Sequence, residues 1–383
     1  MEENSLALHI KNRPAQLKEA REKGTKIIGY FPGNYVPEEL IVAAGAIPLC
    51  LIDGGDPKPV EASLPSIPQT FCPFARAQIG ESVLKRNPYY DLIDMLIAPI
   101  TCQHLKKAAE IWEYRGDIEV FKLGIPHQNK ENYEIEYFES RLKALGDRLQ
   151  AFTGNQPTDS KINSAIELYN RIRSLLLNIA LTRRSSPPPI SALDFVKLNH
   201  ASFYTDPVFM VDVLESTLNE IRNKNDGQES SSIRLLLIGP NIARGDYGVL
   251  ESINSSGGEI VSEEVFEGIR YYWNDIEINN NPYRSLSAGY FENRLRPAFM
   301  RDSSRERLNF ALKLIEDFKA AGVIWYELLC CETYDEESFF FSEELEKKKI
   351  PMLILESDYG MADAGQINIR IQAFIEMIKG GLE

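Results

Sequence analysis

The sequence is poor in the residues that build compact metal sites. It has only four histidines and five cysteines in 383 residues, and no two cysteines form a Cys-x-x-Cys pair. Compact zinc and ferredoxin patterns need ligands at such close spacing, so neither pattern is present. The histidines, at positions 9, 104, 127 and 200, give no basis for a Ser-His-Asp arrangement.

Basic charge and long apolar runs are also scarce. Against 56 Asp and Glu stand 42 Lys and Arg, which gives a net charge of −14 and argues against a nucleic-acid partner. Apolar stretches such as 43–52 and 95–100 are far shorter than the ~20 residues that cross a bilayer. The N-terminus, MEENSLALHI, lacks the apolar region of a secretory signal. We therefore expect a soluble cytoplasmic protein with reduced thiols and no membrane partner.

Phosphate-binding motifs are missing as well. The turns Pro32-Gly33-Asn34 and Gly239-Pro240-Asn241 each follow an expected strand. Neither is followed by Gly-Lys-Ser/Thr, and neither completes Gly-x-Gly-x-x-Gly. ATP or dinucleotide binding by this chain is therefore unsupported.

Strand and helix patterns alternate in both halves of the chain, which predicts the α/β class. Expected strands lie at 25–30, 45–52, 92–99, 118–123, 233–238, 258–261, 322–329 and 350–356. Expected helices lie at 73–85, 103–114, 247–254, 304–320, 343–349 and 365–379. Between the halves, apolar residues at helical spacing run from 133 to 184 and from 207 to 221. We predict two Rossmann-like or flavodoxin-like parallel-sheet domains, 1–130 and 233–383, joined by a helical connector over 131–232, with the polar run 223–232 as a boundary.

Three cysteines occupy similar places in this pattern. Cys72 precedes an expected helix, and Cys102 and Cys331 each lie where a strand ends. A helix N-terminus stabilises a thiolate, which suits a metal ligand or a nucleophile. Ligands bind beyond the carboxyl ends of parallel strands, so the three thiols could converge on one cleft. The alternative is that each cysteine is a small buried hydrophobe.

The other candidates are weaker. Cys50 lies in an apolar run and is expected in the core. Cys330 and Cys331 are adjacent, so side chains that alternate along a strand would bring only one of them to the cleft. His104 could complete a zinc site or act as a base, but such a histidine is more often at the surface of a helix N-terminus. The acidic cluster 335–337 is expected to be solvated.

The pieces that carry a family resemblance are weak singly and specific as an ordered set. They are 28–41, 43–48, 71–76, Cys102, 124–126, 236–239, 257–261, 322–325, 331–332, 350–358 and 365–374. With them the chain resembles the 2-hydroxyacyl-CoA dehydratase and benzoyl-CoA reductase family, in particular its shorter iron-sulfur subunit.

The resemblance implies a 4Fe-4S cluster between the two α/β domains, with one iron bound by a ligand other than cysteine. Its ligands would be Cys72, Cys102 and one of Cys330 and Cys331. Cys331 is the better match because Glu332 follows it, and the family often has Cys-Asp or Cys-Glu there. Thiolates suit iron-sulfur ligation.

The resemblance also implies an oxygen-sensitive enzyme subunit that works on an acyl-CoA, as a dehydratase (lyase) or a reductase. A separate ATP-hydrolysing iron-sulfur activator would deliver single electrons at low potential. A paralogous subunit or a second copy would complete a dimer.

The chain also departs from the family pattern. It has Phe266 where many relatives have a cysteine. This leaves open a related double-cubane cluster protein that reduces small molecules, in which Cys50 and Cys330 could add ligands to an 8Fe-9S cluster. A non-catalytic electron-relay subunit and a zinc-stabilised or metal-free binding protein also stay open.

Overall fold

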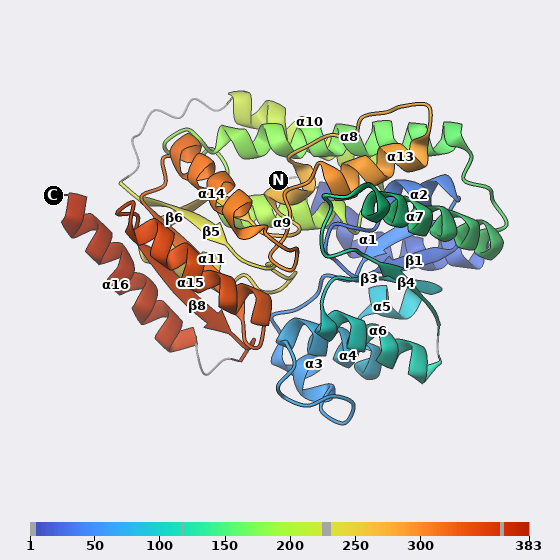
Figure 1. The fold of residues 1–383 in the computed structure, drawn as a ribbon, viewed down its shortest axis with the longest axis horizontal. Helices are drawn as coiled ribbons and strands as arrows, with labels where there is room; N and C mark the ends of the chain where they lie inside the picture. The colour runs from blue at the N-terminus through green and yellow to red at the C-terminus, as the bar shows by residue number, and fades with distance from the viewer. Residues whose placement is uncertain (1–4, 117, 224–230, 361–363, 383) are drawn as a thin grey trace.

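The protein is built on two four-stranded parallel sheets. The computed structural model describes residues 5–116, 118–223, 231–360 and 364–382. The strand orders are β2-β1-β3-β4 and β6-β5-β7-β8, so the sheets share one topology, that of flavodoxin-like folds. Figure 1 shows the first sheet and its helices in blue to teal and the second in yellow to red. The predicted α/β fold with two parallel-sheet domains is confirmed.

The first sheet has its most apolar strands in the middle. β1 (Ile27–Tyr30) is fully buried and β3 (Met95–Ile100) nearly so, as expected of parallel strands covered on both faces. The flanking strands are β2 (Ile47–Cys50) and β4 (Glu119–Gly124). The helices of this half are α1 (Ser5–Glu22), α2 (Glu38–Ala43), α3 (Pro57–Ala62), α4 (Pro73–Leu84), α5 (Pro88–Leu92) and α6 (Gln103–Arg115).

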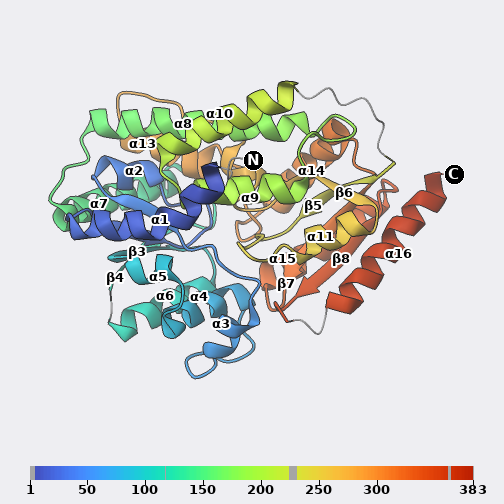
Figure 2. The same ribbon diagram turned by 180° about the vertical axis from the view of Figure 1, so that it is seen from behind.

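The second sheet repeats this plan. β5 (Ile233–Ile238) and β7 (Gly322–Leu328) are central, and β6 (Gly258–Glu264) and β8 (Met352–Ser357) lie at the edges. Its helices are α11 (Gly248–Ser255), α12 (Ile269–Tyr272), α13 (Pro282–Ser287), the π-helix η1 (Ala288–Glu292), α14 (Ser304–Phe318), α15 (Glu332–Glu346) and α16 (Ala364–Leu382). In both views α16 lies at the outer edge of the molecule (Figures 1 and 2).

The helix predicted over 343–349 was wrong in its start. α15 begins eleven residues earlier, at Glu332. Its buried residues are Tyr334, Glu337, Ser338, Phe341 and Leu345, which recur at helical spacing. The acidic residues between them obscured this period in the sequence.

The expectation that residues 335–337 are solvated is wrong at Glu337. Asp335 and Glu336 are exposed, but Glu337 is buried and forms an ion pair with Arg307, which is fully buried on α14. Arg307 also pairs with Glu264 at 2.7 Å. A buried charge needs such partners. Through Arg307, the buried face of α15 is linked to α14 and to β6.

Four helices connect the two halves: α7 (Asn132–Thr153), α8 (Asp159–Thr182), α9 (Ala192–Ser202), which was not predicted, and α10 (Pro207–Asn223). Figure 2 shows α8 running along both halves. On α8, Arg173 pairs with Glu39 of α2 at 2.9 Å, and Arg183, which directly follows α8, pairs with Glu263 of β6 at 2.5 Å. All four side chains are buried, so this helix holds both sheets.

Most of the predicted boundary 223–232 lies outside the described residues. Among the helices that the structure describes, none is long and apolar enough to span a membrane.

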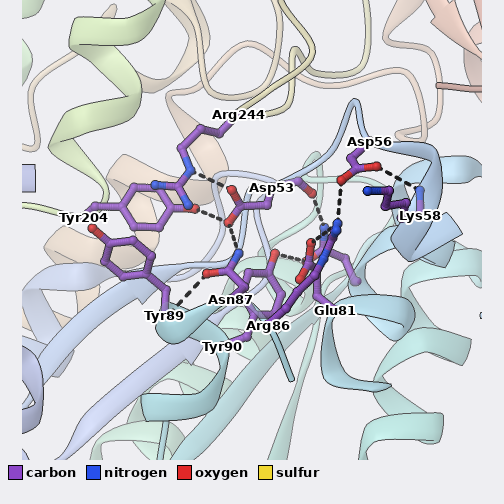
Figure 3. A network of polar contacts seen from close by, with 11 residues as sticks. Asp53, Asp56, Lys58, Glu81, Arg86, Asn87, Tyr89, Tyr90, Tyr204 and Arg244 are labelled. Carbon is purple, nitrogen blue, oxygen red and sulfur yellow. Dashed lines mark hydrogen bonds and ion pairs between the residues drawn. The ribbon is translucent and has the colours of Figure 1, made fainter. Parts of the chain in front are cut away.

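The two halves also meet directly beside the first sheet. Asp53, after β2, forms an isolated parallel bridge with Arg244, in the loop after β5. The N–H of Arg244 donates to Ile52 at 2.9 Å, and the N–H of Gly54 donates to Arg244 at 3.1 Å. Figure 3 shows the polar network around this joint. The ends of the two sheets are therefore tied together by backbone as well as by side chains.

Candidate functional site

Three cysteines precede helices, which the sequence predicts for Cys72 and Cys102. Cys72 is the residue before α4, Cys102 the one before α6 and Cys331 the one before α15. The Sγ of Cys102 accepts a hydrogen bond from the N–H of Leu105 at 3.4 Å. Each thiol thus stands where free backbone N–H groups of a first helical turn point.

One cavity brings the three cysteines together. It is formed by loops of both halves and holds about 630 Å³ of space free of protein atoms, counting solvent at its mouth. The residues that line it are Pro32, Gly33, Cys72, Phe74, Ala75, Thr101, Cys102, His104, Leu105, Pro240, Asn241, Phe266, Glu267, Phe299, Leu328, Cys331, Thr333 and Tyr334. The predicted convergence of Cys72, Cys102 and Cys331 on one cleft is therefore observed.

The two sheets contribute equivalent loops to this cavity. The turn at 32–33 follows β1 and the turn at 240–241 follows β5, the first strand of each sheet. Cys102 follows β3 and Cys331 follows β7, the third strand of each. These loops leave the sheets where the strand order reverses, which is where open α/β sheets bind ligands. In the sequence these turns were candidates only for phosphate-binding loops, and this role was not predicted.

Two glycines allow the close packing that shapes the site. Gly80 of α4 faces Pro59 of α3, and a Cβ there would stand 1.7 Å from the Pro59 carbonyl oxygen. At Gly239, before the second turn, a Cβ would stand 2.2 Å from the carbonyl oxygen of Tyr326. A larger residue at either position would displace an element that carries a cavity residue.

The structure distinguishes Cys331 from Cys330. Both lie in the turn after β7, where the N–H of Cys331 donates to the carbonyl oxygen of Leu328 at 2.9 Å. Cys330 has a left-handed backbone (φ 62°), and Cys331 lines the cavity while Cys330 does not. The turn, rather than alternation along a strand, brings only one of the pair to the cleft.

Cys50 lies in the core, as expected. It is 1% exposed at the end of β2 and borders a smaller cavity with Tyr30, Glu38 and Phe203. Burial raises the pKa of its thiol well above the ordinary value. All five cysteines are free of disulfides.

Burial dominates the electrostatics of the three cavity thiols. It raises the pKa of Cys72 to about 12, with a further contribution from Cys102. The pKa values of Cys102 and Cys331 are raised for the same reason. The helix N-termini favour the thiolates, but desolvation outweighs them. Ligation to a metal centre reverses this balance, because a coordinating thiol is deprotonated outright.

His104 supports the backbone at Cys72. Its Nδ1 accepts a hydrogen bond from the N–H of Cys72 at 3.2 Å, and its ring lies 4.5 Å from that of Phe71. Burial lowers its pKa, so the imidazole is neutral with its proton on Nε2. His104 is therefore half-buried in the cavity wall and not a surface residue.

The arrangement of the thiols differs from that around a single ion. Within residues 5–116, 118–223, 231–360 and 364–382, no group of three or more His, Cys, Asp or Glu side chains could hold a metal ion. The three thiols border one space without meeting at one point. Glu267 and Asn241, two further polar residues of the cavity, had no signal in the sequence.

Comparison with known proteins finds relatives that match nearly the whole chain. The dehydratase-type protein YjiM of Escherichia coli (strain K12) is 25% identical over 94% of this chain and 93% of its own length. A benzoyl-CoA reductase subunit of Thauera aromatica is 23% identical, over 95% and 93%. The (R)-phenyllactyl-CoA dehydratase beta subunit of Clostridium sporogenes is 22% identical, over 94% of both chains. Residues 34–378 match the family model for the 2-hydroxyglutaryl-CoA dehydratase D-component, and the chain therefore belongs to that family.

Proposed function

We propose that this chain is the iron-sulfur subunit of an ATP-activator-dependent enzyme of the 2-hydroxyacyl-CoA dehydratase or benzoyl-CoA reductase type. Cys72, Cys102 and Cys331 would hold a 4Fe-4S cluster. The observation that carries the proposal is that these three cysteines, each at a helix start, line one cavity between the two sheets.

The donor set fits such a cluster. Three soft thiols suit iron-sulfur ligation better than magnesium or calcium, which prefer oxygen. The thiols border a space rather than a point, as the ligands of a multi-atom cluster do. The wall around them is largely apolar, and the hydrophobic shell of a cluster tunes its reduction potential.

When bound, the cluster would supply single low-potential electrons to an acyl-CoA thioester. The chain's own contribution is positional. The first turns of α4, α6 and α15 point their N–H groups toward the thiolates and stabilise the negative charge. His104 holds the backbone at Cys72 in place.

A single cluster is favoured over a double-cubane cluster. Cys50 borders a different cavity, and Cys330 is not among the residues that line the cavity of Cys331. Neither of the two spare thiols lines the cavity of the other three, although Cys330 is near enough to Cys72 to help raise the pKa of its thiol. This supports one cluster for each chain.

We further propose that the chain works with partners. Two of its relatives are named as subunits, one of a benzoyl-CoA reductase and one of a phenyllactyl-CoA dehydratase. A second subunit would complete the enzyme, and a separate ATP-hydrolysing activator would reduce the cluster.

Iron and sulfide analysis of the protein, purified without oxygen, tests the proposal. About four irons and four sulfides per chain, with an EPR signal in the reduced form, are expected. About eight irons would favour the double-cubane alternative. Absence of iron in the anaerobic protein would refute the proposal. Turnover of an acyl-CoA that requires activator and ATP separates an enzyme subunit from an electron relay.

A further inference from the structure

A small cavity beside the cysteine-lined one has two buried arginines in its wall. This arginine-lined cavity holds about 220 Å³ of space free of protein atoms, counting solvent at its mouth. Arg270 of α12 and Arg294, which follows η1, both line it and are 4% and 7% exposed. None of its lining residues, all within the described part of the chain, is Asp or Glu. The charge in its wall is therefore positive.

Arg294 has no carboxylate to balance its charge. Its Nη1 donates to the carbonyl oxygen of Asn34 at 2.9 Å, but Nε and Nη2 have no hydrogen-bond partner among the described residues. By contrast, the equally buried Arg173, Arg183 and Arg307 each pair with a glutamate. A buried charge without a counter-charge is costly, and buried polar groups are nearly always bonded. The exception at Arg294 points to an anionic ligand.

The aromatic neighbour of Arg294 does not supply the missing charge. The Tyr290 ring centre lies 4.0 Å from the Arg294 guanidinium, which favours the cation. The Tyr290 hydroxyl donates to Glu39 at 2.7 Å, and Glu39 pairs with Arg173 at 2.9 Å. The carboxylate that Tyr290 contacts is thus already balanced by another arginine, and Nε and Nη2 of Arg294 still lack an acceptor.

The two unpaired atoms of Arg294 form a fork. Nε and Nη2 lie on the same edge of the planar guanidinium and direct two N–H groups side by side. The two oxygens of a carboxylate match this spacing and accept both hydrogen bonds at once. An ion without such a planar pair of acceptors, such as chloride, cannot use the fork in this way.

Two further donors border the arginine-lined cavity. Arg270 pairs through Nε with Glu264 at 2.9 Å and donates through Nη2 to Tyr334 at 2.6 Å, but its Nη1 has no hydrogen-bond partner. The Tyr35 hydroxyl contacts the Met300 sulfur at 3.9 Å, and a thioether is only a weak acceptor. Both groups are therefore available to an anion in this cavity.

We propose that the arginine-lined cavity binds the carboxylate of a small organic acid. Nε and Nη2 of Arg294 would hold its two oxygens, and Nη1 of Arg270 and the Tyr35 hydroxyl would complete the site. A phosphate group is less well matched, because it adds oxygens and up to a second charge in a space of this size. The inference goes beyond the proposed function, since it requires neither the cluster nor a thioester.

Binding of three simple anions to the full-length protein tests the ligand class. In a buffer free of carboxylates, phosphate and chloride, titration calorimetry should give acetate a Kd of about 10 mM or lower, within the limit for so small a ligand. Acetate should bind more tightly than inorganic phosphate and chloride. Equal or tighter binding of either ion, or no acetate binding up to about 100 mM, would overturn the inference.

Variants test the fork. Arg294→Lys keeps the charge but loses the paired donors and should weaken acetate binding by about tenfold. Arg294→Met removes the charge as well and should abolish measurable binding. Exposed Arg301→Lys, the same substitution seven positions later, is the matched control and should leave the Kd unchanged.

Thermal unfolding separates a ligand site from a structural role. Acetate should raise the Tm of the parent protein and of Arg301→Lys, because it binds the folded state, and should raise that of Arg294→Lys much less. If Arg294→Met does not fold, Arg294→Lys decides the question. A Kd for acetate in folded Arg294→Lys equal to that of the parent would refute the role of Arg294. The iron content of the protein is independent of this result, so the proposed function and the anion site can fail separately.

Discussion

Arg244 and Asp53 form an ion pair between the two halves of the protein, with 2.6 Å between Nε and Oδ1 (Figure 3). The other carboxyl oxygen of Asp53 accepts hydrogen bonds from the Tyr204 hydroxyl at 3.1 Å and the Asn87 amide at 3.2 Å. The Arg244 guanidinium lies 4.0 Å from the centre of the Tyr204 ring. This mostly buried charge pair thus adds to the backbone bonds and to α8 in holding together the two sheets that supply the cavity thiols.

Removing the Arg244 side chain should weaken this joint. Arg244→Met leaves the Asp53 carboxylate with neutral partners, and we expect a loss of about 2–4 kcal/mol in the free energy of unfolding, somewhat below the cost of breaking a fully buried pair. Urea unfolding measures it. The control is Arg171→Met, which breaks the exposed pair with Glu215 at a cost of about 1 kcal/mol or less. Equal effects of the two substitutions would contradict the structural role of Arg244.

Local patterns predicted the elements and the placement of the cysteines. β1, β3, β5 and β7 are short apolar runs between turn residues, and this signal depends only on neighbouring residues. Cys72 and Cys102 were placed before helices for the same reason, whereas Cys331 was placed only at a strand end because the start of α15 was not predicted. The order of the eight strands was therefore predictable from sequence, whereas several helices, α9 among them, were not predicted.

The remaining features depend on contacts between distant segments. Glu337 has the local composition of a surface residue, and only Arg307, thirty positions earlier, makes it a buried one. Glu267 follows Glu263 and Glu264, and no local pattern distinguishes Glu267, which lines the cavity, from the other two. The turns after β1 and β5 form a cavity only because the two sheets meet, which no single segment encodes.

The two neighbouring residues Glu336 and Glu337 provide a matched test of the buried pair. Glu337→Ala leaves fully buried Arg307 with one carboxylate fewer, and we expect a loss of about 3 kcal/mol in the free energy of unfolding. Glu336→Ala, at an exposed position, should change it by no more than about 0.5 kcal/mol. Chemical denaturation of both variants measures the difference. Similar losses in the free energy of unfolding for the two variants would mean that the ion pair between Glu337 and Arg307 does not stabilise the fold.

Stability should depend on pH through Glu38. Burial raises the pKa of this carboxyl to about 7, although the Tyr30 and Tyr271 hydroxyls donate to it at 2.7 and 2.9 Å. Between pH 4.5 and 7 the folded protein therefore binds more protons at Glu38 than the unfolded chain does. The contribution of Glu38 to the free energy of unfolding must then fall as pH rises through this window.

Glu38→Gln removes that titration. Between pH 5 and 7 the free energy of unfolding of the parent protein should fall relative to the variant, by at most about 1.4 kcal/mol per pH unit. Urea unfolding at several pH values measures it. The exposed substitution Glu336→Gln should leave the parent slope unchanged. Parallel curves of unfolding free energy against pH for the parent and Glu38→Gln would show that the folded and unfolded states bind protons equally at Glu38.

The adjacent cysteines provide the sharpest test of the cluster ligands. Cys331 lines the cavity and Cys330 does not, although they share one turn. We expect Cys331→Ser to lose most of its iron, from about four per chain, and its visible absorbance, since serine is a poor ligand for a thiolate-bound cluster. Cys330→Ser should retain both, and Cys102→Ser should behave like Cys331→Ser. Iron analysis and EPR of the anaerobic proteins measure this. The two substitutions are chemically identical and one residue apart. Loss of iron in Cys330→Ser but not in Cys331→Ser would therefore show that Cys330 is the ligand, which would require the turn after β7 to rearrange around the cluster.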